Sequence, residues 1–199
     1  MICFFMYVFR EPARQVQAAV DRLRKVYPDC DLFVGYDGTP AHGIHGAVEI
    51  GLSHAKEDRF GGLWTHRYLA ICLTRSTHQF IMRVDPDTEC IQRMDRPTFD
   101  HGLFGCYRNI GNAAYPAMFL HGAALGFTRR AAEDYVSNGW MLSPAFINSG
   151  FKTVDDKMVL RVATEHGIAI HDRPDFSCGR HGQCENPTFR HRRAWETVQ

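Results

Sequence analysis

The chain has 199 residues, 45% of them hydrophobic and 23% charged, which is enough for one domain with a substantial core. Its formal net charge of +1 gives no overall field that would favour nucleic acid or an acidic partner. The 7 cysteines lack the spacing of a disulfide framework, and no apolar stretch approaches the roughly 18 residues that a membrane span requires. We therefore expect a globular protein of the cytoplasm, without a transmembrane segment, for which a peripheral position at a membrane surface stays open.

The first third of the chain predicts a strand, a helix and a second strand. Residues 2–9 are an apolar run, residues 12–27 carry apolar side chains at helical spacing, and residues 31–36 are a second apolar run. Such a unit predicts parallel strands joined by a right-handed crossover. Ligands of open α/β sheets bind beyond the carboxyl ends of the strands, and Arg10 and Asp37 lie at two of those ends.

The next segment predicts a long loop and a helix. Glycine, histidine and charged residues fill positions 39–62, so we expect a loop with one short element within 48–55. Residues 64–75 predict a helix that leads to an apolar strand at 80–84.

That strand ends at Asp85-Pro86-Asp87. Proline has no amide hydrogen and holds φ near about −65°, so the two carboxylates lie on a stiff turn. Two hard oxygen ligands held in this way suit a divalent cation that carries phosphate groups. Asp-Pro-Asp is also an ordinary turn sequence, and both interpretations stay open at this point.

The second half of the chain predicts shorter elements. Glycines and prolines over 93–116 predict loops and short strands, whereas residues 117–127 predict a strand that contains Gly122 and Ala123. Small residues inside a strand often mark the close approach of a ligand. Thr128 is the expected N-cap of a following helix.

Two acidic residues open the last predicted helix, which covers residues 153–166 and is followed by a short strand at 168–171. The presence of Asp155 and Asp156 at the start of a helix is explained by their favourable interaction with the helix dipole. In a functional interpretation, one of them is a general base. We expect a catalytic domain over residues 1–175 and an irregular basic tail over residues 176–199.

Three segments in this order resemble the glycosyltransferases of the GT-A fold, and within that fold the Fringe and β-1,3-galactosyltransferase-like families. They are the strand and D-x-D at 80–87, the glycine-rich strand with Thr-Arg-Arg-Ala at 121–132, and the acidic pair, helix and strand at 155–171. The resemblance implies an α/β fold, a single GT-A-like (Rossmann-like) domain with a mostly parallel central sheet flanked by helices. Fringe-like sequences usually carry three consecutive acids, a membrane anchor and a stem. This sequence has Asp-Pro-Asp in place of the three acids and shows neither anchor nor stem, so the resemblance implies a small soluble version.

The activity that the resemblance implies is sugar transfer from a nucleoside-diphosphate sugar, a UDP-sugar first, to a glycan, lipid or protein acceptor. The implied cofactor is Mn²⁺ or Mg²⁺, held by Asp87 with help from Asp85. Asp156, or Asp155 in its place, is the implied base of an inverting transfer.

Further residues take implied roles around the donor. Arg10, Asp37, Gly122 and Ala123 are expected at the nucleotide sugar, where the arginine offsets the charge of the leaving diphosphate. A late histidine often completes the metal site of these families. His171 and His181 are both candidates, and His181 is preferred because it follows the last strand in a turn-rich segment.

Haloacid-dehalogenase-like phosphatases are an alternative enzyme class. They place D-x-D-x-T after an apolar strand, as the segment 85–88 does, with Asp85 as nucleophile and the later acidic pair on Mg²⁺. Their motif normally lies near the start of the domain, whereas a strand–helix–strand unit precedes it here.

A non-enzymatic alternative depends on the segment from Cys178 to Cys184. The two cysteines and His181 are possible zinc ligands, and the basic tail would then contact nucleic acid. The spacing fits no standard zinc finger, so we expect no nucleic-acid partner.

Overall fold

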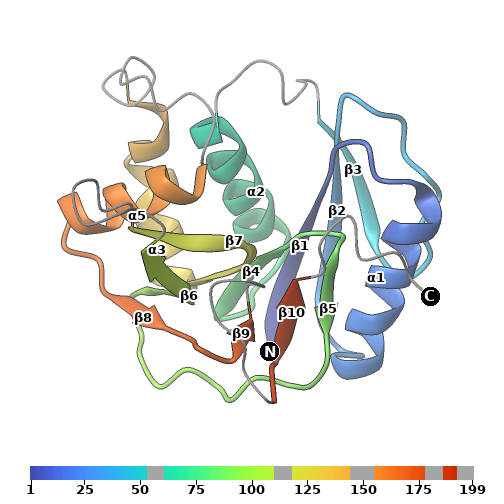
Figure 1. Ribbon diagram of the computed structural model, residues 1–199. Coiled ribbons are helices and arrows are strands. Elements are labelled where there is room, and N and C mark those ends of the chain that lie inside the picture. The colour runs from blue at the N-terminus through green and yellow to red at the C-terminus, as the bar shows by residue number, and fades with distance from the viewer. Residues whose placement is uncertain (53–60, 110–117, 144–154, 178–185, 192–199) are drawn as a thin grey trace.

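Figure 1 shows the computed structural model of the chain, in which residues 1–52, 61–109, 118–143, 155–177 and 186–191 are described. The helices are α1 (Ala13–Val26), α2 (Gly61–Arg75), α3 (Arg129–Ser137), α5 (Asp155–Glu165) and the short 3₁₀ helix η2 (Trp140–Leu142). The strands are β1 (Ile2–Val8), β2 (Asp31–Asp37), β3 (Val48–Leu52), β4 (Phe80–Val84), β5 (Thr88–Cys90), β6 (Leu103–Asn109), β7 (Met118–Thr128), β8 (Ile170–Asp172), β9 (Phe176–Ser177) and β10 (Phe189–His191). No helix within these ranges combines the length and the apolar character needed to cross a membrane.

The main sheet has 7 strands in the order β3-β2-β1-β4-β7-β6-β8. Strands β3, β2, β1 and β4 pair in parallel, and so do β6 and β8. Strand β7 is antiparallel to both β4 and β6, so β6 runs in the same direction as β4. The predicted mostly parallel sheet is therefore confirmed, and the carboxyl ends of β1, β2 and β4 meet at one edge.

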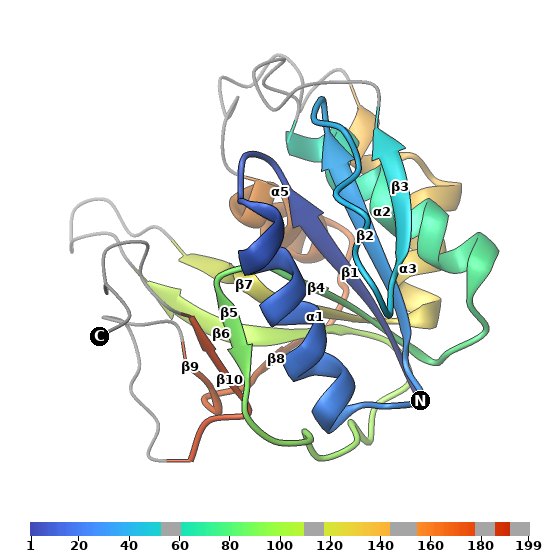
Figure 2. The ribbon, with the colours of Figure 1, turned by 90° about the vertical axis from the view of Figure 1, so that its right-hand side faces the viewer.

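Both faces of this sheet are covered. Alternate side chains of β1 point to opposite faces, so Phe4 and Met6 pack with α1 while Cys3 and Phe5 pack with α2, α3 and α5. Figure 2 shows α1 on one side of the sheet and α2 and α3 on the other. Because both faces are buried, these strands are continuous apolar runs, which is why they were predictable from local sequence.

A second sheet of 3 short strands, in the order β5-β10-β9, lies on the α1 side. Phe176 on β9 and Phe189 on β10 are each 1% exposed, and their ring centroids lie 4.9 Å apart. The expected irregular tail from residue 176 therefore needs correction, because part of it forms strands and enters the core. Two or three residues are too short for a periodic signal, and the partner strand β5 lies far away in the sequence.

Three further expectations from the sequence can be compared with the structure. The segment 93–116, predicted as loops and short strands, contains the 7-residue strand β6, whose partners are β7 and β8. The short element expected within 48–55 is the edge strand β3. Thr128 does cap α3, because its side chain accepts a hydrogen bond from the N–H of Ala131.

Candidate functional site

Four successive strands of the sheet bring predicted site residues to one edge. Asp37 ends β2, Arg10 follows β1, and Asp85 follows β4. The N-terminal half of β7 lies beside the end of β4, since Val84 is paired with Ala124. The prediction that these residues share one edge of the sheet agrees with this order of strands, which Figure 1 lets the reader follow.

The D-x-D forms a tight turn between β4 and β5. The N–H of Thr88 donates to the carbonyl of Asp85 at 2.9 Å, so residues 85–88 make a four-residue turn with Pro86 at its second position. The carboxylates of Asp85 and Asp87 lie on half-buried residues. Arg83 on β4 forms an ion pair with Asp85, with 3.2 Å between Nη2 and Oδ1. The turn thus presents two carboxylates, one of which already has a cationic neighbour.

A network of hydrogen bonds shapes the neighbouring end of β1. The carboxylate of Glu11 accepts hydrogen bonds from the N–H groups of Phe9 at 2.7 Å and Arg10 at 3.1 Å. The guanidinium of Arg10 lies 4.7 Å from the ring centroid of Phe9. Arg10 is exposed, which suits a residue that would meet an anionic ligand.

Glu49 on β3 is a residue that sequence analysis missed. Its carboxylate accepts hydrogen bonds from the hydroxyl of Tyr36 and from the N–H groups of His42 and Gly43. Burial alone would raise the pKa of Glu49, but these hydrogen bonds outweigh burial and lower it. Glu49 therefore holds the chain after β2 in place, and only the pairing of β3 with β2 could have identified it.

Asp37 and the small residues of β7 flank the turn on two sides. Asp37 is 1% exposed at the end of β2, so it is a buried carboxylate rather than a surface residue. Gly122 and Ala123 directly precede Ala124 on β7, and this part of the strand lies next to the start of the D-x-D turn. Their backbone is thus placed where a ligand at the turn would approach it.

Asp155 and Asp156 are the first two residues of α5, a helix that contacts β7 and α2. Their side chains lie outside what the structure describes, as do residues 178–185 with His181, Cys178 and Cys184. The roles expected for all of these residues stay predictions.

His171 lies apart from the D-x-D. It is on β8, which β7 and β6 separate from β4, and the strand register puts it level with Met82 in the middle of β4. Its ring stacks on Phe99 with 3.5 Å between centroids, and burial lowers its pKa. The structure therefore does not bring His171 to the residues with which it was predicted to share a metal.

The backbone of a different histidine lies next to the turn. Strand β10 pairs antiparallel with β5, and this register puts the backbone of His191 opposite Thr88, the residue after Asp87. Sequence analysis did not select His191, because it belongs to a basic segment that showed no strand pattern.

Within the described residues, no group of three or more histidine, cysteine, aspartate or glutamate side chains could hold a metal ion by itself. Mg²⁺ and similar ions are commonly bound by one or two carboxylates, with substrate phosphates and water as the other ligands. The D-x-D turn fits a metal that arrives with a phosphate-bearing ligand, rather than a metal held in a closed protein site.

No known protein-family profile matches the chain, and no curated protein matches it. Among solved structures, it is similar to the galactosyltransferase LgtC in complex with donor and acceptor sugar analogs, with 14% identity and a TM-score of 0.59 over 88% of this chain and 74% of that one. An active-site glutamine-to-glutamate mutant of LgtC gives 13% identity and a TM-score of 0.62 over 96% of this chain and 86% of that one. The chain has a GT-A-like fold. At this level of identity the likeness concerns the fold alone.

Proposed function

We propose that this protein is a metal-dependent glycosyltransferase, which transfers a sugar from a nucleoside-diphosphate sugar to an acceptor hydroxyl. The observation that carries the proposal is the D-x-D turn at the carboxyl end of β4, in a sheet of GT-A-like topology. The fold favours this activity over the haloacid-dehalogenase-like alternative, in which Asp85 would be a nucleophile. The similarity to a galactosyltransferase solved with donor and acceptor sugar analogs supports a sugar donor, and a UDP-sugar is the first one to test.

In this proposal, the turn and its neighbours bind the diphosphate. A bound Mn²⁺ or Mg²⁺ would be held by the carboxylates of the turn and would offset the negative charge of the leaving diphosphate. Asp87 is the carboxylate ligand, and Asp85 stays oriented by Arg83. Arg10, which follows the neighbouring strand β1, would add positive charge at the phosphates.

The remaining residues take supporting roles. The buried Asp37 and the backbone of Gly122 and Ala123 would line the donor on either side of the turn. His191 replaces His171 as the proposed histidine ligand, because the pairing of β10 with β5 puts the backbone of His191 opposite Thr88. His181 stays a further candidate.

The acceptor would be activated from α5. Asp156, with Asp155 as second choice, is the proposed base that removes the proton of the acceptor hydroxyl. Such a base implies inversion at the anomeric carbon, as the Fringe-like resemblance also does. Product analysis by NMR tests this step, since a product with retained configuration would exclude the role of Asp156 as base. A glycan, lipid or protein can each offer the acceptor hydroxyl.

The first experiment is a thermal-shift screen of nucleoside diphosphates and UDP-sugars, each with and without Mn²⁺. A ligand that binds only the native state raises Tm by mass action, by an amount equivalent to about 2.7 kcal/mol at 100 times its Kd. We expect stabilisation by one nucleotide series, only when Mn²⁺ is present. No response to any nucleotide, together with hydrolysis of a generic phosphate ester, would instead favour the phosphatase.

Two variants separate binding from transfer. Asp87→Ala should abolish the Mn²⁺-dependent rise in Tm, because it removes the proposed metal ligand. Asp156→Asn should keep this rise in Tm and lose sugar transfer. Asp29→Ala, at an exposed aspartate in the turn between α1 and β2, is the control and should behave like the wild type. Full activity of either site variant would remove that residue from the mechanism.

A further inference from the structure

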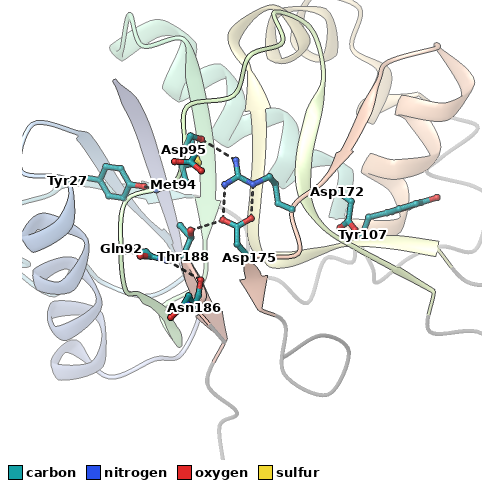
Figure 3. A network of polar contacts seen from close by, with 10 residues as sticks. Tyr27, Gln92, Met94, Asp95, Tyr107, Asp172, Asp175, Asn186 and Thr188 are labelled. Atoms are coloured by element: carbon teal, nitrogen blue, oxygen red, sulfur yellow. Dashed lines mark hydrogen bonds and ion pairs between the residues drawn. The ribbon is translucent and has the colours of Figure 1, made fainter. Parts of the chain in front are cut away.

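Arg173, Asp175 and Thr188 form a hydrogen-bonded polar cluster next to the small sheet. Figure 3 shows Asp175 and Thr188 within this network of polar contacts. The Nε and Nη2 atoms of Arg173 each donate to a different oxygen of Asp175 at 2.8 Å. The hydroxyl of Thr188 donates to Oδ2 of Asp175 at 2.7 Å. Paired hydrogen bonds between a guanidinium and a carboxylate combine strength with a fixed orientation, so the cluster holds its members in one geometry.

The environment keeps Asp175 ionised. Burial alone would raise its pKa, but the hydrogen bonds from Arg173 and Thr188 and the charge of Arg173 outweigh burial and lower it. The side chains of Arg173 and Asp175 are only 17% and 26% exposed, so water competes weakly for these contacts. The geometry of the cluster therefore persists at neutral pH.

The cluster joins parts of the chain that are far apart in the sequence. The N–H of Arg173 donates to the carbonyl of Gly105 on β6 at 2.8 Å, and its Nη1 donates to the carbonyl of Asp95 at 3.2 Å. The N–H of Thr188 donates to the carbonyl of Asp175 at 2.8 Å. The start of β10 is thus tied both to the main sheet and to the segment that follows β5.

Strand β10 leads from this cluster to the D-x-D turn. It begins directly after Thr188 and ends at His191, which lies opposite Thr88. Three residues of extended chain span about 10 Å, so the cluster lies too far away to contact a metal at Asp87 and must act through the strand.

Strand β10 has other contacts besides the cluster: the N–H of Ile91 donates to the carbonyl of Thr188 at 2.9 Å, and Nε2 of Gln92 donates to the carbonyl of Asn186 at 3.0 Å. Strands β5, β9 and β10 have 3, 2 and 3 residues, and so short a sheet is only marginally stable without anchoring contacts. Phe189 anchors one face of β10 in the core. The polar cluster adds a tie between the start of β10 and the main sheet.

We infer that Arg173, Asp175 and Thr188 are positioning residues of the metal site, which hold β10 so that it aligns the D-x-D turn and His191. This inference rests on the proposed function and adds residues that touch neither metal nor substrate. It predicts that damage to the cluster weakens metal binding even where the fold survives.

Isothermal titration of Mn²⁺, alone and in the presence of UDP, tests the inference. Thr188→Val removes one hydrogen bond at nearly constant shape, Asp175→Asn removes the charge, and Arg173→Lys keeps the charge but loses the paired geometry. Loss of a residue hydrogen-bonded directly to a metal ligand typically weakens metal binding by about 10-fold to 100-fold. We expect a weaker but measurable loss for Asp175→Asn, which acts through β10. Thr188→Ser keeps the hydroxyl and should bind Mn²⁺ like the wild type.

The matched control is Leu69→Ala on α2, which lies in the core on the opposite face of the main sheet. It should lower Tm without changing the Kd for Mn²⁺, provided that titrations are made well below each Tm. Unchanged Mn²⁺ affinity in the folded variants of Asp175, Arg173 and Thr188 would overturn the inference while leaving the proposed function intact. Absence of Mn²⁺ binding by the wild type would overturn both.

Discussion

Gly126 on β7 lies against the ring of Phe104 on the neighbouring strand β6. A Cβ atom at this position would overlap the ring, which is buried and cannot move freely. We expect Gly126→Ala to lower the free energy of unfolding by about 1–3 kcal/mol, as is usual for overpacking. Urea denaturation measures the change.

Gly51 on β3 provides the matched control, because a Cβ there meets no heavy atom within 4 Å. Gly51→Ala should be neutral or slightly stabilising, since alanine loses less conformational entropy in a strand. Equal losses for the two variants would show that the Phe104 contact is not responsible.

The burial of two histidines predicts how the stability of the fold depends on pH. Burial lowers the pKa of His171 and of His66 below the ordinary histidine value of 6.5. As the pH falls below about 6.5, the unfolded chain therefore binds protons before the folded chain does, and stability decreases. Denaturation by urea at about pH 7.5 and about pH 5.5 should show this decrease.

The contribution of His171 can be separated by substitution. His171→Leu should reduce the pH dependence of the free energy of unfolding, because it removes a histidine whose pKa burial lowers. An identical pH dependence in the wild type and His171→Leu would contradict the proposed role of burial.

At the scale of elements, the junction between β7 and α3 depends on Thr128. Its Oγ1 accepts hydrogen bonds from the N–H groups of Ala131 at 3.3 Å and Gly102 at 3.1 Å, and the residue is 2% exposed. Thr128→Val keeps the shape and leaves these donors without that acceptor, so we expect a loss of about 1–3 kcal/mol in the free energy of unfolding. Chemical denaturation should show that Thr128→Ser retains most of the stability, and a comparable loss in both variants would contradict the role of the hydroxyl.

Elements also differ in how well sequence patterns predicted them. The apolar runs of β1, β2 and β4 and the amphipathic pattern of α1 are local signals, and all four elements were found close to their observed bounds. Strands β9 and β10 have 2 and 3 residues; β10 is a strand because it pairs with the distant β5, and β9 is a strand because it pairs with β10.

At the scale of the whole molecule, the C-terminal segment is part of the core. The ring of Phe189 lies 4.9 Å from that of Phe176 and 6.3 Å from that of Phe4, measured between centroids. Phe189→Ala should lower the free energy of unfolding by about 3–5 kcal/mol, because it leaves a cavity under the sheet. Thermal and urea denaturation measure the loss.

Arg190, the next residue, is exposed and serves as the control. Arg190→Ala should change stability by no more than about 0.5 kcal/mol. A small effect of Phe189→Ala would mean that the segment from residue 186 is an appendage, as the sequence had suggested.

Local patterns of the sequence determined the order of the main elements, the parallel sheet and the turn Asp85-Pro86-Asp87, because periodicity and turn chemistry involve neighbouring residues. They also placed Arg10 and Asp37 correctly at strand ends. Only the tertiary structure decided that β10 lies on β5, which brings His191 rather than His171 to the turn, and that Arg173 and Asp175 anchor that strand. The pairing of β10 with β5 joins residues about a hundred positions apart, and its energy comes from burial and hydrogen bonds that exist only once the chain has folded.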